Sequence, residues 1–134
     1  MFYEVTSKIV RMDSNGNDKE VLERLLIKDC ELFAEAETRA MQEYNNENNV
    51  VAIKQSKILE FVNERTDDDE SIYLATIESV FTDDYGNETT SKYVVGLFSD
   101  SVEKATKTTI DYMKQGMDDL ILVGIKRTKF IDLI

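Results

Sequence analysis

The sequence predicts an α+β protein formed by internal duplication of a ββαβ unit. Three observations lead to this prediction. Segments rich in β-branched and aromatic residues flank turns that contain Asn and Gly, stretches with apolar residues at helical spacing follow them, and the second half of the chain repeats this order. We expect two helices packed with pseudo-two-fold symmetry on one mainly antiparallel sheet, or on two sheets that exchange their last strands.

The repeat is visible when residues 1–64 are set beside residues 71–134. The segment 51–62 matches the segment 123–134, and four of its twelve positions are identical. Such self-similarity is typical of a duplicated structural unit. The acidic stretch 65–70 joins the two copies and has the composition of an exposed linker. We therefore predict a single domain that consists of two repeats and a short linker.

Each repeat is expected to open with a β-hairpin. Its strands carry the Val, Ile, Thr, Tyr and Phe residues that a pleated sheet favours. Asn15-Gly16 and Gly86-Asn87 fall between the strands and tolerate the positive φ angles of tight hairpin turns. The hairpin strands are expected at residues 2–10 and 21–27 in the first repeat, and at residues 72–81 and 92–98 in the second.

A helix is expected after each hairpin, because apolar residues recur there at i, i+3, i+8 and i+11 on one helical face. The first helix should open at residues 29–30 and end at Asn45-Asn46. A serine, Ser99 or Ser101, should cap the second helix, and Gly116 should end it in the left-handed conformation. The expected core positions are Phe33, Ala36, Met41 and Tyr44 in the first helix, and Val102, Ala105, Ile110 and Met113 in the second.

The last strand of each repeat carries a pair of basic residues. Lys54 and Lys57 recur as Lys126 and Lys129, and Arg127 is added in the second copy. In a regular strand, Lys57 and Lys129 would lie on an otherwise apolar face. One interpretation is a bulge or bend that leaves the cations in solvent. The other is a duplicated anion-binding site, in which these side chains meet a phosphate, a nucleotide or a nucleic-acid backbone.

The composition excludes several classes of function. The 134-residue chain has no His and a single Cys, so a Ser-His-Asp triad, a His-containing zinc site and an internal disulfide cannot form. It has no Gly-rich phosphate-binding motif and no nucleophile elbow. The 27 acidic residues outnumber the 16 basic ones, which lowers the expectation of non-specific binding to nucleic acid.

Two runs carry a family resemblance: FYEVTSKIVRMDSNGNDKEV at residues 2–21 and LLIKDCELFAEAETRA at residues 25–40. An aromatic-led first strand, the Asn15-Gly16 turn and a helix that begins at FAEAE, residues 33–37, make the chain similar to an uncharacterised family of small proteins from Bacteroidetes and their bacteriophages. The pattern differs at Phe2-Tyr3, where Trp-Phe is expected. The resemblance covers nearly the whole chain and implies an origin, but it supplies no catalytic residues.

From these observations we expect a non-enzymatic accessory protein of a phage or mobile element that binds another protein, of host or phage, in the cytoplasm. A homo-oligomer also fits. The alternatives are a module that binds an anion, a nucleotide or a nucleic-acid fragment through the repeated basic residues, and an enzyme of unknown class. We expect neither a cofactor nor a metal. No apolar stretch has the length of a signal peptide or a membrane span, so no membrane partner is expected.

Overall fold

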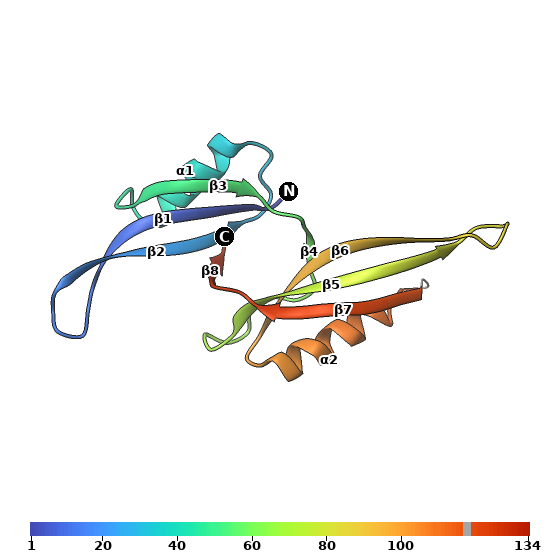
Figure 1. Ribbon diagram of the computed structural model, residues 1–134. Helices are drawn as coiled ribbons and strands as arrows, with labels where there is room; N and C mark the ends of the chain where they lie inside the picture. Colours follow the sequence, from blue (N-terminus) through green and yellow to red (C-terminus); the bar gives the residue numbers. More distant parts are fainter. Residues whose placement is uncertain (117–118) are drawn as a thin grey trace. The chain divides into compact units, whose positions relative to one another are not determined.

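The computed structural model describes residues 1–116 and 119–134. These residues form an α+β structure with two helices and two mainly antiparallel four-stranded sheets, which confirms the α+β class and the two helices of the prediction (Figure 1). Of the two expected sheet arrangements, the one with two sheets is observed. No helix in these residues has the length and apolar character needed to cross a membrane. In chain order the elements are β1 (Tyr3–Met12), β2 (Asp18–Ile27), α1 (Phe33–Glu43), β3 (Asn49–Gln55), β4 (Ile58–Phe61), β5 (Ser71–Thr82), β6 (Glu88–Ser99), α2 (Val102–Met113), β7 (Asp119–Arg127) and β8 (Phe130–Leu133).

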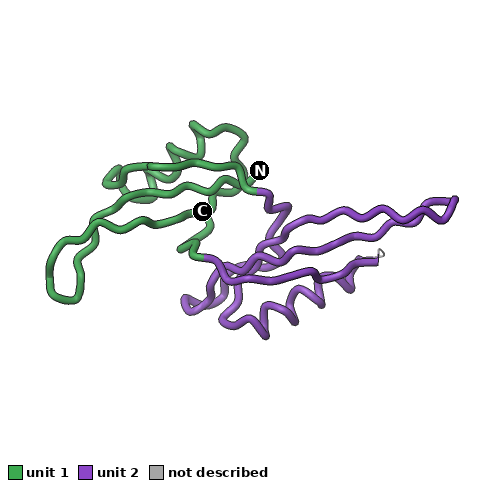
Figure 2. Tube along the Cα trace, in the orientation of Figure 1, with its two compact units in different colours: residues 1–56, 129–134 green, residues 57–128 purple. Residues whose placement is uncertain are grey.

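The chain forms two compact units, each with one sheet and one helix (Figure 2). Unit 1 consists of residues 1–56 and 129–134, and unit 2 consists of residues 57–128. The strand order is β3-β1-β2-β8 in unit 1 and β4-β6-β5-β7 in unit 2. The borders of the units therefore lie elsewhere than the borders of the repeats, which the sequence places at residues 64 and 71.

The long last strand of each repeat is broken, which corrects the expectation of continuous strands over residues 51–62 and 123–134. The first of these divides into β3, antiparallel to β1 in unit 1, and β4, parallel to β6 in unit 2. The second divides into β7, antiparallel to β5 in unit 2, and β8, parallel to β2 in unit 1. The breaks leave Lys57 and Lys129 between strands, where a charged side chain keeps its hydration.

In unit 1, α1 covers one face of the sheet through two small buried residues, Ala36 and Ala40, which let the helix approach the strands closely. The buried core consists of Tyr3, Val5, Leu25, Ile27, Cys30, Ala36 and Ala40. Phe33 was expected in this core but is exposed, because it is the first residue of the helix. Its ring makes a T-shaped contact with the ring of Tyr3, with 5.1 Å between ring centres. The apolar spacing did not indicate Ala40.

In unit 2, α2 packs on β5, β6 and β7. Its buried residues are Ala105 and Thr109, and the Thr109 hydroxyl donates a hydrogen bond of 2.8 Å to the Ala105 carbonyl. The rest of the buried core consists of Tyr73, Ala75, Ile77, Val95 and Leu97. Val102 and Ile110 were expected in the core and are exposed, because small residues four apart determine which face of the helix meets the sheet.

The N-terminal ends of the two helices differ. Asp29 adopts a left-handed φ of 56°, so α1 cannot open at residues 29–30 as expected. Leu32 occupies its N-cap position and provides no side-chain hydrogen bond. Ser101 caps α2 as expected, because its side chain accepts a hydrogen bond of 3.2 Å from the backbone N–H of Lys104.

The C-terminal ends confirm one expectation and correct another. Asn45 and Asn46, with φ of 54° and 62°, follow α1 in the left-handed conformation. In contrast, α2 ends at Met113, and Lys114 after it stays right-handed with φ of −70°. Gly116 does not adopt a positive φ, so it is not the expected left-handed C-cap.

Both hairpins end in the same type of turn. An aspartate side chain, Asp13 or Asp83, accepts hydrogen bonds of 2.9 Å from the backbone N–H groups two and four residues later. Gly16 and Gly86 supply the expected positive φ, at 80° and 81°. The hairpins extend past the helices (Figure 1). We call the extensions arm 1, residues 9–22, and arm 2, residues 81–89. Arm 1 begins after Lys8, where the β3 ladder ends, and stops before Arg24, where the β8 ladder begins; arm 2 begins after Val80, where the β7 ladder ends.

Candidate functional site

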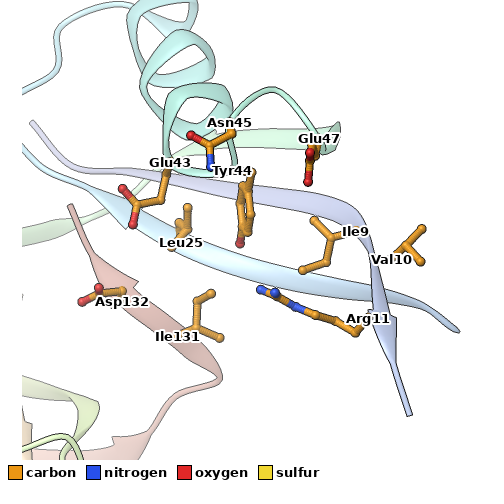
Figure 3. A pocket seen from close by; sticks show the side chains of 10 residues that line it. All are labelled: Ile9, Val10, Arg11, Leu25, Glu43, Tyr44, Asn45, Glu47, Ile131 and Asp132. Carbon is orange, nitrogen blue, oxygen red and sulfur yellow. The ribbon is translucent and has the colours of Figure 1, made fainter. Parts of the chain in front are cut away.

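A cavity of about 360 Å³ opens beside the C-terminal end of α1 in unit 1. Figure 3 shows Tyr44 in its middle, with Leu25 and Ile131 on one side of the ring and Ile9 on the other. The lining residues come from β1, β2, β8, the end of α1 and the loop after it. The hairpin and the helix therefore build this cavity together.

A hydrogen-bonded network of Arg11, Glu23 and Tyr44 lies at the cavity. The Arg11 guanidinium donates from Nε to Glu23 Oε2 at 3.1 Å and from Nη2 to Glu23 Oε1 at 3.0 Å. The Tyr44 hydroxyl donates to the same Oε1 at 3.1 Å. The side chain of Glu23 is 16% exposed, whereas that of Arg11 is 56% exposed. The network thus fixes a largely covered carboxylate and ties arm 1 to the end of the helix.

Tyr44 is held in its neutral form. Burial, together with the negative charge of Glu23 and the hydrogen bond that Glu23 accepts from the hydroxyl, raises the pKa of Tyr44 to about 12. A neutral phenol at physiological pH donates a hydrogen bond but does not act as a general base. Tyr44 therefore takes part in this network as a hydrogen-bond donor.

Carboxylates stand around the rim of this cavity. Glu43 and Asp132 lie on one side of Tyr44 and Glu47 lies on the other, as Figure 3 shows. They give the rim an excess of hydrogen-bond acceptors over donors. Within residues 1–116 and 119–134, no three His, Cys, Asp or Glu side chains are grouped as metal ligands.

The five basic residues singled out in the sequence are all exposed. In unit 1, Lys54 lies in β3 and Lys129 directly precedes β8, and these are the two edge strands of the sheet. In unit 2, Lys57 directly precedes β4, whereas Lys126 and Arg127 lie in β7 at the opposite edge. Three strand spacings, about 14 Å, separate the edges of a four-stranded sheet, so neither unit gathers its basic residues at one edge.

Sequence reasoning did not single out Arg11 and Glu23, and it placed Tyr44 only in the core. The sequence does contain a signal that Arg11 and Glu23 lie on one face of the hairpin. The hairpin turn fixes the register, and alternation then sets Arg11 and Glu23 on the same face as Tyr3 and Val5. Their meeting with Tyr44 depends on where α1 ends, which local sequence indicates less well.

Comparisons with known proteins place the chain in a family. No curated protein and no solved structure matches it. A family model described as a domain of unknown function, DUF4494, matches residues 1–134. The chain therefore belongs to the DUF4494 family of domains of unknown function.

Proposed function

We propose that the chain is a non-enzymatic module that binds another protein, and that it serves a phage or a mobile element as an accessory protein. The observation that supports binding is the exposure of large apolar side chains on the two arms. The proposed origin, including the link to Bacteroidetes, rests on the sequence resemblance described above. Host or phage proteins are the proposed partners, and the host-cell cytoplasm is the proposed location.

Arm 1 presents an apolar surface. Val10, Met12 and Leu22 are 59%, 72% and 61% exposed. The register of the hairpin places all three on the face opposite to the one that α1 covers. A two-stranded ribbon has no core of its own beneath such residues, so their exposure is not required for the fold. Clustered apolar side chains of this kind mark surfaces that associate with a partner.

Arm 2 presents aromatic residues instead. Phe81 in β5 is 64% exposed, and Tyr85 in the turn is 91% exposed. Aromatic side chains are enriched among the residues that dominate protein–protein binding energy, because they bury a large area at a small entropy cost. The two arms therefore offer two different surfaces to a partner.

The test is affinity purification of the full chain from its own host, followed by identification and purification of the co-purifying polypeptide. Leu22→Glu should weaken binding of that polypeptide at least about tenfold. Leu59→Glu is the matched control, because Leu59 in β4 is also 61% exposed but lies outside the arms. Equal affinities of the two variants, or the absence of any stoichiometric partner, would contradict the proposal.

A second candidate is a module that binds an anion, a nucleotide or a nucleic-acid fragment. The exposure of Lys54, Lys57, Lys126, Arg127 and Lys129 favours it, since each is accessible to a ligand. Native mass spectrometry of the protein from its host should then detect a bound phosphate-containing mass. A Lys57→Glu, Lys129→Glu double variant should lose binding of AMP and of a short single-stranded DNA while its melting temperature stays nearly unchanged; retained affinity would rule this candidate out.

We also propose that the two units arose by duplication. Two features support this idea. The order β3-β1-β2-β8 of unit 1 corresponds strand by strand to the order β7-β5-β6-β4 of unit 2. The β1–β3 ladder and the β5–β7 ladder also shift register at equivalent residues. Those shifts fall between Thr6 and Ser7 in β1 and between Thr76 and Ile77 in β5. If the proposal is right, residues 1–64 alone should associate as a dimer in which β4 of each copy replaces β8, and light scattering would detect it.

A further inference from the structure

β1 continues past its partner β3 and leaves part of its edge unpaired. The β1–β3 ladder ends at Lys8, whereas β1 runs on to Met12. The Phe2 carbonyl accepts a hydrogen bond from the N–H of Ser56, which follows β3, so the backbone groups of the even-numbered residues in β1 point to this edge. Among the residues that the structure describes, no strand pairs with Val10 and Met12 on that side. A further strand can therefore pair with them.

Unit 2 shows that a strand fits at this place. The two hairpin turns lie 70 residues apart, so Val80 in β5 stands where Val10 stands in β1. The β5–β7 ladder reaches Val80, which pairs with Asp119 of β7. In unit 1, β3 begins only at Asn49, opposite Lys8, so the equivalent position beside Val10 lies outside the ladder.

A cavity lies on each face of the sheet beside this open edge. The cavity around Tyr44 is on the face that α1 covers, to which Ile9 points. A second cavity, of about 310 Å³, is lined by Lys8 and Val10, which point to the opposite face, and by residues 46–49. Figure 3 shows Ile9 and Val10 on opposite sides of the β1 ribbon. Successive side chains of an added strand alternate between the faces and would enter the two cavities in turn.

We infer that an extended segment of the partner protein pairs with β1 at this edge and directs a Lys or Arg side chain into the cavity around Tyr44. This inference rests on the proposed binding function and specifies the segment that is bound. The segment runs antiparallel to β1, as β7 runs antiparallel to β5 at the equivalent edge. Directly opposite residues share a face, so the residue opposite Ile9 is the one that points to Tyr44.

The charge of the cavity around Tyr44 selects a basic side chain. Its rim carries the carboxylates of Glu43, Glu47 and Asp132. Arg11 also lines the cavity, but its charge is already paired with Glu23. The stem of a Lys or Arg can lie along the apolar wall while its charged group reaches the carboxylates. The residues before and after the basic one point to the opposite face, beside the apolar surface of arm 1, so they should be apolar.

The test uses two synthetic peptides of one composition and the full chain. In acetyl-Val-Lys-Val-Lys-Val-Lys-amide the basic and apolar residues alternate, whereas in acetyl-Val-Val-Val-Lys-Lys-Lys-amide they form blocks. In NMR titrations, the alternating peptide should shift the amide signals of residues 9–12 and 46–49 with a dissociation constant of about 0.1–1 mM, because so short a segment buries less than a standard interface. The block peptide should bind at least about tenfold more weakly. Val10→Pro, which removes an edge N–H, should also cost about tenfold, and Val10→Ala, which keeps it, should cost less.

Charge exchange makes the test independent of any effect of proline on folding. A Glu43→Lys, Glu47→Lys variant should lose the alternating Lys peptide and bind its Glu counterpart, acetyl-Val-Glu-Val-Glu-Val-Glu-amide. The matched control, Glu103→Lys with Asp111→Lys, makes the same charge change at exposed positions in α2 and should bind like the wild type.

Three results would overturn the inference: equal binding of the alternating and block peptides, equal loss in the two double variants, and signals of residues 9–12 that shift with chain concentration alone, which would make a second copy the occupant. A native partner whose binding depends on Leu22 but not on Glu43 and Glu47 would contradict this inference and leave the proposed function in place.

Discussion

The contact between Gly96 and Phe61 in unit 2 gives a sharp prediction. Gly96 is buried in β6, where it pairs with Phe61 in β4. A Cβ atom at residue 96 would lie 2.6 Å from Cε1 and Cζ of the Phe61 ring and 2.9 Å from Cδ1. The ring also packs against Phe98, with 5.4 Å between ring centres. Gly96→Ala therefore forces the Phe61 ring away from its packed position.

The size of the effect follows from this geometry. Ordinary contacts of a Cβ atom begin at 3.4 Å, so the ring or the strand must move by the difference of 0.8 Å. Overpacking of a filled site costs about 1–3 kcal/mol. For a chain of this size, each kcal/mol lowers the melting temperature by about 4 °C. We expect Gly96→Ala to lower the free energy of unfolding by about 2 kcal/mol and the melting temperature by about 8 °C.

Urea unfolding in dilute solution and calorimetry would measure this change. Gly124→Ala is the control, because a Cβ atom there meets nothing within 4 Å and its backbone φ is not positive, so it should stay within about 0.5 kcal/mol of the wild type. In a Phe61→Leu background the smaller side chain should remove most of the cost of Gly96→Ala. The reasoning fails if the two glycine variants are equally stable, or if the cost persists beside Leu at residue 61.

Three further predictions concern other parts of the fold. Deleting residues 129–134 removes β8 and the backbone hydrogen bonds that Ile134 makes with Leu26 and Lys28. Hydrogen exchange should then show that amide protection is lost in residues 1–56 and kept in residues 57–128. Equal loss of protection in both segments would contradict the division into two units. Ser101→Ala should lower the free energy of unfolding, measured in urea, by about 1 kcal/mol, because it removes the N-cap of α2. Leu32→Ser should raise it by about 0.5 kcal/mol, because it supplies the side-chain cap that α1 lacks. A lower stability of Leu32→Ser would contradict the assignment of Leu32 as the N-cap residue of α1. The pKa of Tyr44, through burial first, and the pKa of Tyr112, through its hydrogen bond to Glu60 first, are both raised from 10 to about 12. The folded state holds these protons more tightly than the unfolded state, so the melting temperature should fall as pH rises from about 10 to about 12, and less so in a Tyr44→Phe, Tyr112→Phe variant; a level profile in the wild type would contradict it.

Local signals indicated the hairpins and several element ends. The Asn-Gly and Gly-Asn turns fix the two hairpins, because few residues tolerate the positive φ that Gly16 and Gly86 adopt. Ser101 caps α2 through its own side chain, and Asn45-Asn46 follow α1 through their own backbone conformation, so both roles can be predicted without the tertiary structure. These features account for the predicted fold class.

Packing decided what the sequence did not show. The large apolar residues of α2 suggested a face through Val102 and Ile110, but the helix meets the sheet through Ala105 and Thr109. Nothing in the local sequence at residues 56–57 and 128–129, neither Pro nor Gly, indicates a break between strands. The partition of the last strands depends on pairing with distant strands, which only the whole fold determines.

Part of the candidate site could be predicted from the sequence. The position of Arg11 and Glu23 on one face follows from the register of the hairpin. The hydrogen bond from Tyr44 to Glu23, in contrast, depends on the length and position of α1. The repeated lysines drew attention because repetition is conspicuous in a sequence. Within each unit, the structure places them in or directly before strands at opposite edges of the sheet.

The division of the last strands also sets the order in which the chain can fold as it leaves the ribosome. Unit 2 is continuous in sequence, so all of its strands have been synthesised once Thr128 is added. Unit 1 contains the earliest residues, yet it also needs residues 129–134, which are synthesised after every residue of unit 2. In the nascent chain, β2 must therefore wait without its partner β8 until all residues of unit 2 have been synthesised. This is the reverse of the usual N-to-C order of folding during translation.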